Sequence, residues 1–496
     1  MNATPPTGTG GSSSLLSLFR NWVSLAGLVL MASSVFAFVL LFFLDTIAHT
    51  SNPYVGILTF LVAPAFFFAG LMLILFWAWR WRRKMAKANG GAAGLRIDVD
   101  FSRARDRKLL SFFIPASVGF LLITAIVSYH TYQFTESVQF CGESCHTVMK
   151  PELTTYLHSP HARVACAECH IGKGATWYVR SKLSGTYQVY ATLTKKYPTP
   201  IPTPVKNLRP AQETCEQCHW PSQFVGNLDR TFSYYLPDQT NTLYSVRLLL
   251  HVGGGDPTHG PTSGIHWHMN VANKIEYVAA DSARQQIPWV RMTDRQGVVT
   301  VFRTKSFTND VSQMEIRRMD CMDCHNRPAH KLQSPESAVN LAMSLGRLPL
   351  LPYIKTNAVG VLCRPYTNQT QALEGIATTL AQQFPNDPRV REAIAAVQEI
   401  YTNNFFPEMK ASWRDYPDNI GHKDFPGCFR CHDGKHVSST TQTMIKANDC
   451  NVCHWILTQG SGEQLNQLTA QGQKFAHPID EYDPAYQCTD CHNGGM

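Results

Sequence analysis

Fourteen of the fifteen cysteines form pairs, and a histidine directly follows each pair. Six pairs have the spacing Cys-Xaa-Xaa-Cys-His: Cys166/Cys169/His170, Cys215/Cys218/His219, Cys321/Cys324/His325, Cys428/Cys431/His432, Cys450/Cys453/His454 and Cys488/Cys491/His492. A seventh, Cys141/Cys145/His146, has one more residue between its cysteines. Two thiols at this spacing form thioethers to the vinyl groups of one haem, and the adjacent imidazole binds its iron. The pattern predicts seven covalently attached haem c groups.

Disulfide bonds and zinc sites are the competing interpretations of paired cysteines. Disulfides suit an oxidising compartment, but they give no reason for a histidine after every pair. Zinc takes four ligands, so two motifs would have to share each zinc ion, and one of the seven motifs would then have no partner. The last cysteine, Cys363, stands alone in V-L-C-R-P, where we expect a buried or inert thiol.

Electron-transfer haems need a second strong ligand, and neutral imidazole is the commonest choice. Besides the seven motif histidines the chain has twelve others, of which His49 belongs to a loop between apolar stretches. Six distal ligands are predicted: His161, one of the pair His266 and His268, His330, His422, His436 and His477. For each of them a surface or hydrogen-bonded histidine is the alternative, and that alternative is favoured for His158, His251 and His259. The first motif is then left without a histidine, and Met149 is its candidate ligand, with a core methionine as the alternative.

Three apolar stretches precede the cysteines, and they must position the haem-binding part of the chain. Trp22–Leu44, Val55–Trp79 and Leu109–Tyr129 each lack Asp, Glu, Lys and Arg. Each is long enough to cross about 30 Å of hydrocarbon as a helix. We expect a three-helix membrane anchor over residues 22–131, preceded by a disordered cytoplasmic tail over residues 1–21. Buried helices of a soluble core, or a cleaved signal peptide for the first stretch, are the alternatives.

The positive charge is concentrated in one loop of this anchor. Residues 80–108 contain ten Lys and Arg and three acidic residues, which supply +7 of the net charge of +8. The rest of the chain is nearly neutral, which argues against a nucleic-acid-binding surface. Basic loops stay in the cytoplasm, so the N-terminus is expected there and the chain after about His130 in the periplasm. The sequence thus indicates a multi-pass protein of the bacterial inner membrane.

The fold class expected is three transmembrane helices plus a periplasmic multihaem cytochrome c domain. With so many haems in its core, that domain should consist of short helices and loops with little β structure. We divide it into a three-haem module (132–225), an insertion with β-hairpin character (226–320) and a four-haem module (321–496) with a helical insertion (335–405). Trp289–Met292 and Val298–Phe302 are the predicted hairpin strands. Asp387 is predicted to cap a helix that begins at Pro388.

The first three motifs resemble a known family. The blocks C-G-E-S-C-H-T-V-M, Y-L-H-S-P-H-A-R-V-A-C-A-E-C-H and E-T-C-E-Q-C-H-W-P follow an apolar stretch, and together they resemble the NapC/NirT family of membrane-anchored quinol dehydrogenases over residues 110–225. The later blocks N-I-G-H-K-D-F-P-G-C-F-R-C-H and C-H-N-R-P-A-H are similar to seven-haem inner-membrane cytochromes of extracellular respiration. The resemblance implies oxidation of a quinol from the membrane pool, with menaquinol as the expected one, and electron transfer to periplasmic cytochromes or a reductase complex.

The resemblance also implies a quinol site beside the first haem. In the family the motif methionine can bind that haem, which matches Met149, and a lysine after the second motif contacts the quinol, which matches Lys182. The family pattern has an acid near this lysine, but residues 177–190 contain none. Glu143, Glu152 and His130 are therefore the predicted proton acceptors, with ordinary interfacial polar residues as the alternative.

Two other functions remain open at this point. One is a terminal reductase of nitrite, hydroxylamine or a sulfur oxyanion, which would need a haem with an open coordination position. The other is a membrane anchor that serves as the electron-transfer subunit of a larger cytochrome complex. The sequence contains no P-loop or dinucleotide fingerprint that would indicate a different enzyme class.

Overall fold

The computed structural model of the protein describes residues 22–48, 62–88, 102, 104–144, 146–172, 174–205, 208–254, 263–269, 273–438, 440–446, 450–478 and 486–492. The predicted tail, the loop that contains His49, most of the basic loop, Cys145 and His259 lie outside these residues. The chain divides into two compact units, Met1–Ser144 and Cys145–Met496, so the division falls inside the first motif.

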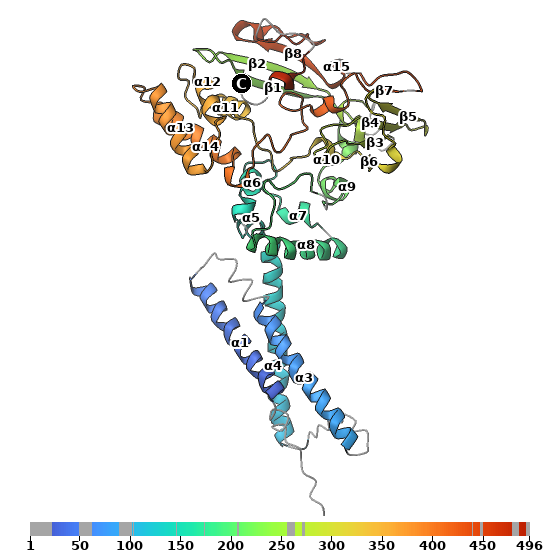
Figure 1. The fold of residues 1–496 in the computed structure, drawn as a ribbon, viewed down its shortest axis with the longest axis vertical. Coiled ribbons are helices and arrows are strands. Elements are labelled where there is room, and N and C mark those ends of the chain that lie inside the picture. The colour runs from blue at the N-terminus through green and yellow to red at the C-terminus, as the bar shows by residue number, and fades with distance from the viewer. Residues whose placement is uncertain are drawn as a thin grey trace, which may run out of the picture. The chain divides into compact units, whose positions relative to one another are not determined.

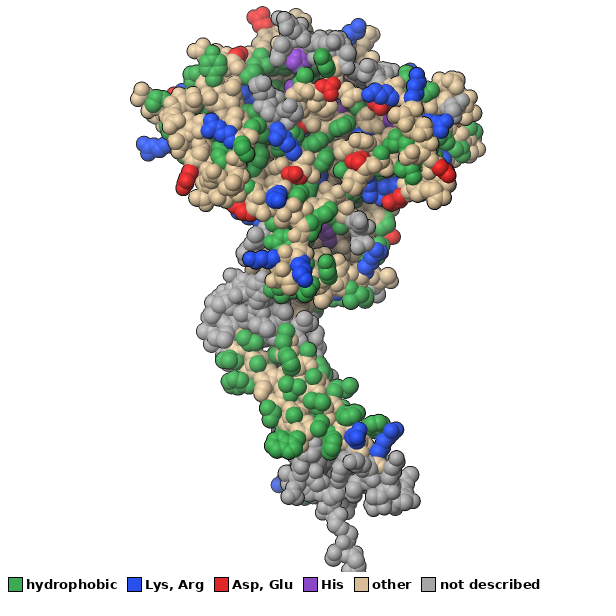
Figure 2. Space-filling view, in the orientation of Figure 1, with side chains coloured by type: hydrophobic (Ala, Val, Ile, Leu, Met, Phe, Trp, Pro, Cys, Tyr) green, Lys and Arg blue, Asp and Glu red, His purple; other side chains and the backbone are tan. Residues whose placement is uncertain are grey.

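The first unit contains two long apolar helices, α1 (Trp22–Ala48) and α3 (Ala63–Ala88). Their segments Trp22–Leu41 and Ala63–Arg80 have mean hydropathies of 2.3 and 1.5 and are long enough to span a membrane. The helices pack closely through small residues, since a Cβ atom added at Gly27 would lie 2.7 Å from the Gly70 carbonyl oxygen. Most of their apolar side chains point outward, as Figure 2 shows, which suits lipid rather than water as the surroundings.

The third predicted membrane stretch forms part of α4 (Ala104–Thr135), a helix of 32 residues that continues through Pro115. A membrane helix tolerates such a proline, but whether α4 crosses the membrane stays a prediction. The predicted end of the anchor at residue 131 lies inside α4. The helix is followed by the short α5 (Val138–Glu143), whose first turn is capped by the Ser137 hydroxyl, which accepts a hydrogen bond from the Phe140 amide.

In the second unit the cysteine motifs lie on short helical turns, because cysteines three residues apart must face the same side to bind one group. The helices that carry or adjoin motifs are α6 (His146–Leu157), α7 (Cys166–His170), α9 (Ala211–Thr214), η3 (Cys215–Gln217), α10 (Cys321–Cys324), η8 (Gly427–Arg430), α15 (Cys450–Cys453) and α16 (Cys488–Cys491). Other short turns are η4 (Pro221–Gln223), η5 (Ile265–Met269), η6 (Val311–Gln313), η7 (Pro407–Met409) and η9 (Gly462–Asn466). A longer helix, α8 (Ala175–Leu193), follows the second motif (Figure 1).

Two antiparallel sheets lie in this unit, so the expectation of little β structure was too low. One sheet has the order β1 (Leu228–Tyr235), β2 (Leu243–Leu250), β8 (His454–Gly460). The other has the order β6 (Arg317–Arg318), β3 (Lys274–Val278), β4 (Trp289–Thr293), β5 (Val299–Arg303), β7 (Val437–Ser438). The pair β4 and β5 coincides with the predicted hairpin strands, with Trp289 opposite Arg303. Each sheet also takes a strand from beyond residue 430, so the insertion and the C-terminal module fold together.

The helical insertion forms a core of its own. It consists of α11 (Pro335–Ser344), α12 (Ile354–Leu362), α13 (Gln369–Gln383) and α14 (Val390–Asn404), which pack around fully buried side chains such as Ile354, Leu380 and Val397. The predicted cap is displaced, because α14 begins at Val390 with Arg389 before it. The Asp387 carboxylate instead accepts a hydrogen bond from the Arg389 amide at 2.9 Å, in the turn that precedes the helix.

Candidate haem-binding sites

Six of the seven motif histidines face a second histidine. Two imidazoles that bind one metal ion from opposite sides, each with its nitrogen about 2 Å from the metal, have ring centres about 6 Å apart. The ring centres of the six pairs are separated by distances of that size: His161–His219 6.1 Å, His170–His330 6.3 Å, His266–His325 6.3 Å, His268–His432 5.9 Å, His422–His454 6.3 Å and His477–His492 6.0 Å. The residues of these sites therefore fit haems with two axial histidines.

The facing histidines are oriented by backbone carbonyl groups. A neutral imidazole carries one N–H and one free lone pair, so a carbonyl bonded to Nδ1 leaves Nε2 available to a metal. Nδ1 contacts a carbonyl oxygen in four of the six: His161 to Pro328 at 3.1 Å, His266 to Val252 at 3.1 Å, His268 to Ile265 at 2.8 Å and His330 to Glu152 at 3.0 Å. This arrangement is the usual support of a metal-binding histidine, and it needs no contribution from the metal to hold the ring.

Burial keeps these rings in the neutral form that binds iron. Burial lowers the pKa of His330 to about 4, with smaller contributions from the charges of Arg327 and His170. Burial likewise lowers the pKa of His268 and of His422. Protons therefore compete weakly with a metal for these nitrogens at neutral pH.

Three of the motif cysteines in the described part of the chain are exposed. They are Cys218, Cys428 and Cys491, whereas Cys215 and the other motif cysteines in the described part of the chain are half-buried. A thioether joins a cysteine to a vinyl group at the edge of the macrocycle, so its sulfur can lie at the rim of a haem site while the imidazole lies beneath the iron. Cys218 lies at the end of η3, where its amide donates to the Cys215 carbonyl oxygen at 3.2 Å. Haem attachment at Cys218 stays a prediction.

Among the motif histidines whose side chains the structure describes, none faces His436, which corrects its prediction as a distal ligand. Its ring is 1% exposed. Its Nδ1 lies 2.7 Å from the Asp433 carboxylate, and its Nε2 lies 2.6 Å from the Ile287 carbonyl oxygen. With both nitrogens engaged, the ring joins the C-terminal segment to the loop before β4. The position that His436 was expected to fill is taken by the second member of the pair His266 and His268, since each of the two faces a different motif.

The loop that presents His161 illustrates how local sequence orients a predicted ligand. The Tyr156 hydroxyl, at the end of α6, donates to the carbonyl oxygens of Ala162 at 2.8 Å and Val164 at 3.0 Å. The Ser159 hydroxyl accepts from the His161 amide at 3.1 Å. These bonds close the turn S-P-H-A-R-V so that the imidazole faces His219 of the following motif.

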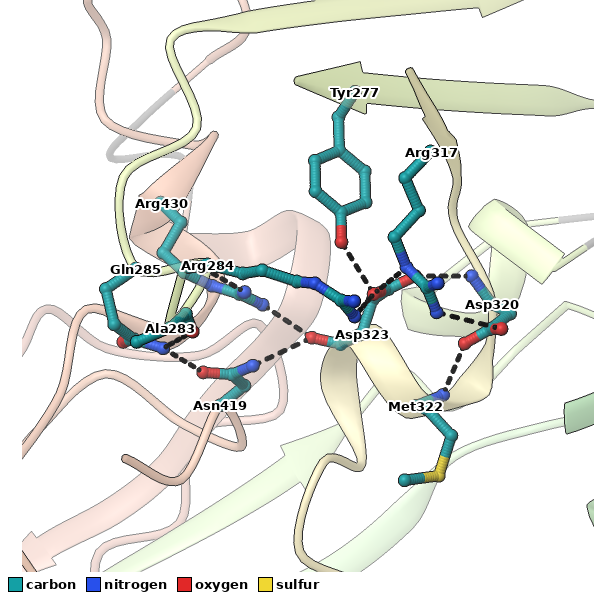
Figure 3. Close-up of polar contacts among 10 residues, drawn as sticks. All are labelled: Tyr277, Ala283, Arg284, Gln285, Arg317, Asp320, Met322, Asp323, Asn419 and Arg430. Carbon is teal, nitrogen blue, oxygen red and sulfur yellow. Dashed lines mark hydrogen bonds and ion pairs between the residues drawn. The ribbon is translucent and has the colours of Figure 1, made fainter. Parts of the chain in front are cut away.

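The residues between motif cysteines also have structural roles, which the sequence did not reveal. Asp323, between Cys321 and Cys324, is almost completely buried, and its carboxylate accepts hydrogen bonds from the Tyr277 hydroxyl at 2.7 Å and Arg317 Nε at 2.9 Å (Figure 3). Arg430, between Cys428 and Cys431, is 8% exposed. The signal that the sequence offered for this role was a charged residue at a position of the motif that accepts any residue type.

The first motif is described in part. Cys141 is half-buried on α5, and Met149 is half-buried on α6, next to the buried Val148. Cys145 and the side chain of His146 lie outside the described part of the chain, as does the side chain of Cys450. Ligation of the first haem by His146 and Met149 therefore stays a prediction.

Known proteins place the chain in a family. Residues 104–205 match the N-terminal region of the NapC/NirT cytochrome c family. The chain is also 40% identical over 487 residues to the cytochrome c-type protein ImcH of Geobacter sulfurreducens, and the alignment covers 95% of both chains. The chain belongs to the NapC/NirT family of c-type cytochromes. No solved structure matches it. It is accordingly a membrane-anchored multihaem electron-transfer protein.

In this NapC/NirT cytochrome the predicted quinol residues belong to both units. His130 and Glu143 are exposed in the first unit. Lys182 is half-buried on α8 of the second unit, with Nζ 5.0 Å from the centre of the Tyr178 ring. Glu152 lies on α6, and burial raises its carboxyl pKa although Arg327 opposes this effect. Its Oε2 atom is buried without a hydrogen-bond partner, which suits a group that takes up a proton.

One face of α8 exposes apolar side chains to the surroundings. Val179, Leu183, Tyr187, Tyr190 and Leu193 recur at helical spacing and are 50–69% exposed. Lys182 lies beside this stripe in the sequence. A helix with an apolar stripe, tyrosines and nearby cations is typical of a segment that lies along a membrane surface.

Proposed function

We propose that the protein is a seven-haem quinol dehydrogenase of the bacterial inner membrane. It oxidises a quinol, for which menaquinol is the leading candidate, at the periplasmic face. It passes the electrons to periplasmic cytochromes or to a reductase complex in anaerobic or extracellular respiration. The six facing histidine pairs are the observation that carries the proposal, because two strong axial ligands at each haem suit electron transfer and leave no position for a substrate at those six sites. This argues for a relay rather than a terminal reductase.

The residues proposed for the quinol site divide the work of the reaction. A quinol gives up two electrons and two protons, and a haem accepts one electron at a time. Lys182 would bind a quinol oxygen through its ammonium group. Glu152, Glu143 or His130 would accept protons. The exposed apolar stripe of α8 supports this location, since a quinol with its hydrocarbon tail enters from the lipid.

The topology proposed has the N-terminus in the cytoplasm, α1, α3 and α4 across the membrane and the haem-binding unit in the periplasm. The apolar segments of α1 and α3 and the basic residues after α3 support it. Covalent attachment of haem in the periplasm agrees with this orientation, because all motif cysteines follow α4 in the chain.

The deciding experiment is stopped-flow reduction of the purified holoprotein in lipid nanodiscs by a menaquinol analogue. Wild type is compared with Lys182→Ala and Met149→Leu, and with Lys305→Ala as a control at an exposed lysine in the loop after β5. We expect rapid haem reduction in wild type and control, and slower reduction in the two site variants. Dithionite should reduce all four proteins alike. Full reduction by dithionite with none by the quinol would show that quinol is not the donor.

A further inference from the structure

The two histidines of the segment I-H-W-H-M face two different motifs. His266 faces His325, and His268 faces His432. Both lie on η5, a helix of the 3₁₀ type with about three residues per turn, so side chains two positions apart point in widely different directions. One short turn can therefore supply distal ligands to two haems, one on each side.

The segment is held firmly enough to set both ligands together. The Ile265 amide donates to the His251 carbonyl oxygen at 2.8 Å, and the His266 amide donates to that of Val252 at 3.0 Å. Gly254 has a φ of +95°, and a Cβ atom there would lie 2.7 Å from Cβ of His266. Trp267, between the two ligands, packs against the buried cluster around Ile275 of β3. A shift of one ligand would therefore move the other.

The two motifs are also joined directly through the residues between their cysteines. Nη2 of Arg430 donates to the Asp323 carbonyl oxygen at 2.7 Å, and its Nη1 donates to that of Arg284 at 2.9 Å (Figure 3). Its Nε donates to the Gly427 carbonyl oxygen, also at 2.9 Å. The Asn419 side-chain amide donates to the same Asp323 oxygen at 3.0 Å. The buried guanidinium thus ties one motif to the other and places a positive charge beside both.

We propose that the haems attached at Cys321/Cys324 and at Cys428/Cys431 form one coupled pair, with His266 and His268 as their respective distal ligands. Reduction of either haem then lowers the potential of the other, because both lie against one half-buried segment and beside the buried side chains of Arg430 and Asp323, where charges are poorly screened. The charge of Arg430 favours the reduced form of both. The inference rests on the proposed haem attachment and does not require quinol as the donor.

The orientation of the rings makes the two haems distinguishable. The planes of His266 and His325 are 3° apart, whereas those of His268 and His432 are 82° apart. In a low-spin ferric haem, parallel imidazoles separate the iron d orbitals and give a rhombic EPR spectrum, and perpendicular imidazoles leave two of them nearly degenerate and give a single large g value. One haem of the pair should give the rhombic signal, and the other should give the signal with the single large g value.

The experiment is EPR-monitored redox titration of the holoprotein with His266→Met or His268→Met, and with the exposed His158→Met as the matched control. Haem content should be unchanged, since the cysteines hold the haems. His268→Met should remove a large-g component and His266→Met a rhombic one. Methionine ligation raises the potential of the altered haem. In the variant that raises the lower-potential haem above its partner, the partner should titrate at a lower potential than in wild type, because its neighbour is then reduced first.

Three outcomes would overturn the proposal. One is a ligand variant whose EPR spectrum is the same as that of the control. Another is an EPR component that disappears in His436→Gln while the spectrum of His268→Met keeps all its components. The third is a partner haem whose midpoint potential moves in neither ligand variant. Should a ligand variant fail to accumulate with haem, Arg430→Gln tests the same pair, since the midpoints of these two haems should fall together while the others stay unchanged. Quinol kinetics are not measured, so failure here leaves the proposed donor untouched.

Discussion

The Tyr277 hydroxyl donates a 2.7 Å hydrogen bond to the carboxylate of Asp323, a side chain that is only 1% exposed. Tyr277 lies on β3, and Asp323 lies between the two cysteines of a haem motif. Burial and the nearby carboxylate together raise the pKa of the tyrosine, so it remains a donor across the physiological range. The motif on α10 is therefore attached to the sheet by the polypeptide itself and not only through a haem.

Replacement of Asp323 by alanine should destabilise this region strongly. The change leaves Arg317, which donates at 2.9 Å, and Tyr277 without their shared acceptor. Breaking a buried ion pair from one side costs about 3–5 kcal/mol. Hydrogen exchange of β3 and α10 in the holoprotein should accelerate accordingly. Asp310→Ala, which removes an exposed aspartate from the same part of the chain, should have little effect. Equal protection in both variants would show that Asp323 does not anchor the motif.

The mass of the holoprotein tests the number of haems. Each motif with two cysteines should hold one haem through two thioethers, so wild type should exceed its polypeptide mass by seven haems. The double variant Cys488→Ala/Cys491→Ala should carry six. Cys363→Ala is the control, because Cys363 follows α12 and packs against the helical core. A wild-type mass below seven haems, or a double variant that keeps the full number, would contradict the count.

Local spacing was enough to predict the proximal histidines, but the histidines that face them depend on contacts between distant segments. His170 faces His330, whereas the nearer His161 faces His219 of the following motif. Nothing near His330 in the sequence specifies this partner. The contrast between His268 and His436 has the same origin, since only the three-dimensional structure shows that His436 is bonded at both nitrogens.

Strand pairing also divides into a local part that the sequence predicts and a long-range part that it does not. The hairpin of β4 and β5 was predictable because a tight turn after Thr293 joins two apolar runs. The pairing of β2 with β8 joins residues about 210 positions apart in sequence, with Leu250 opposite His454, and no local pattern encodes it. β8 begins at the motif histidine His454, so a predicted haem motif leads directly into a strand. The expectation that haems would replace regular structure missed this combination.

The helical insertion should be stable independently of the haems. Leu380 on α13 is completely buried in a core made of side chains alone, and leucine-to-alanine changes at such sites cost about 2–5 kcal/mol. Leu380→Ala should therefore speed hydrogen exchange across α11–α14 and leave the haem EPR spectrum unchanged. Leu341→Ala makes the same chemical change at a position that is 46% exposed, and exchange there should stay near wild type. A changed haem spectrum in the Leu380 variant would show that the two cores are coupled.

The ion-pair cluster on β3 and β4 should make this sheet sensitive to acid. Glu276 lies directly opposite Arg291 in the register, and its carboxylate is 2.7 Å from both Arg291 and Lys274. Burial alone would raise the pKa of Glu276, but these two cations together hold it below the ordinary value of 4.5. A depressed carboxyl pKa contributes stability that is complete above the unfolded value and is lost as the pH falls through the folded one.

Glu276→Gln should therefore weaken the sheet at pH 7 by about 1 kcal/mol, since the cations remain partly exposed to water. The difference from wild type should shrink as the pH falls below 4.5 and through the lower pKa of folded Glu276, because the wild-type carboxylate is then neutralised as well. Hydrogen exchange of the β3 and β4 amides, corrected for intrinsic rates at each pH, measures both effects. Glu315→Gln removes an exposed glutamate and should leave the exchange unchanged at every pH. A deficit that persists undiminished in acid would mean that Glu276 acts through its shape and not through its charge.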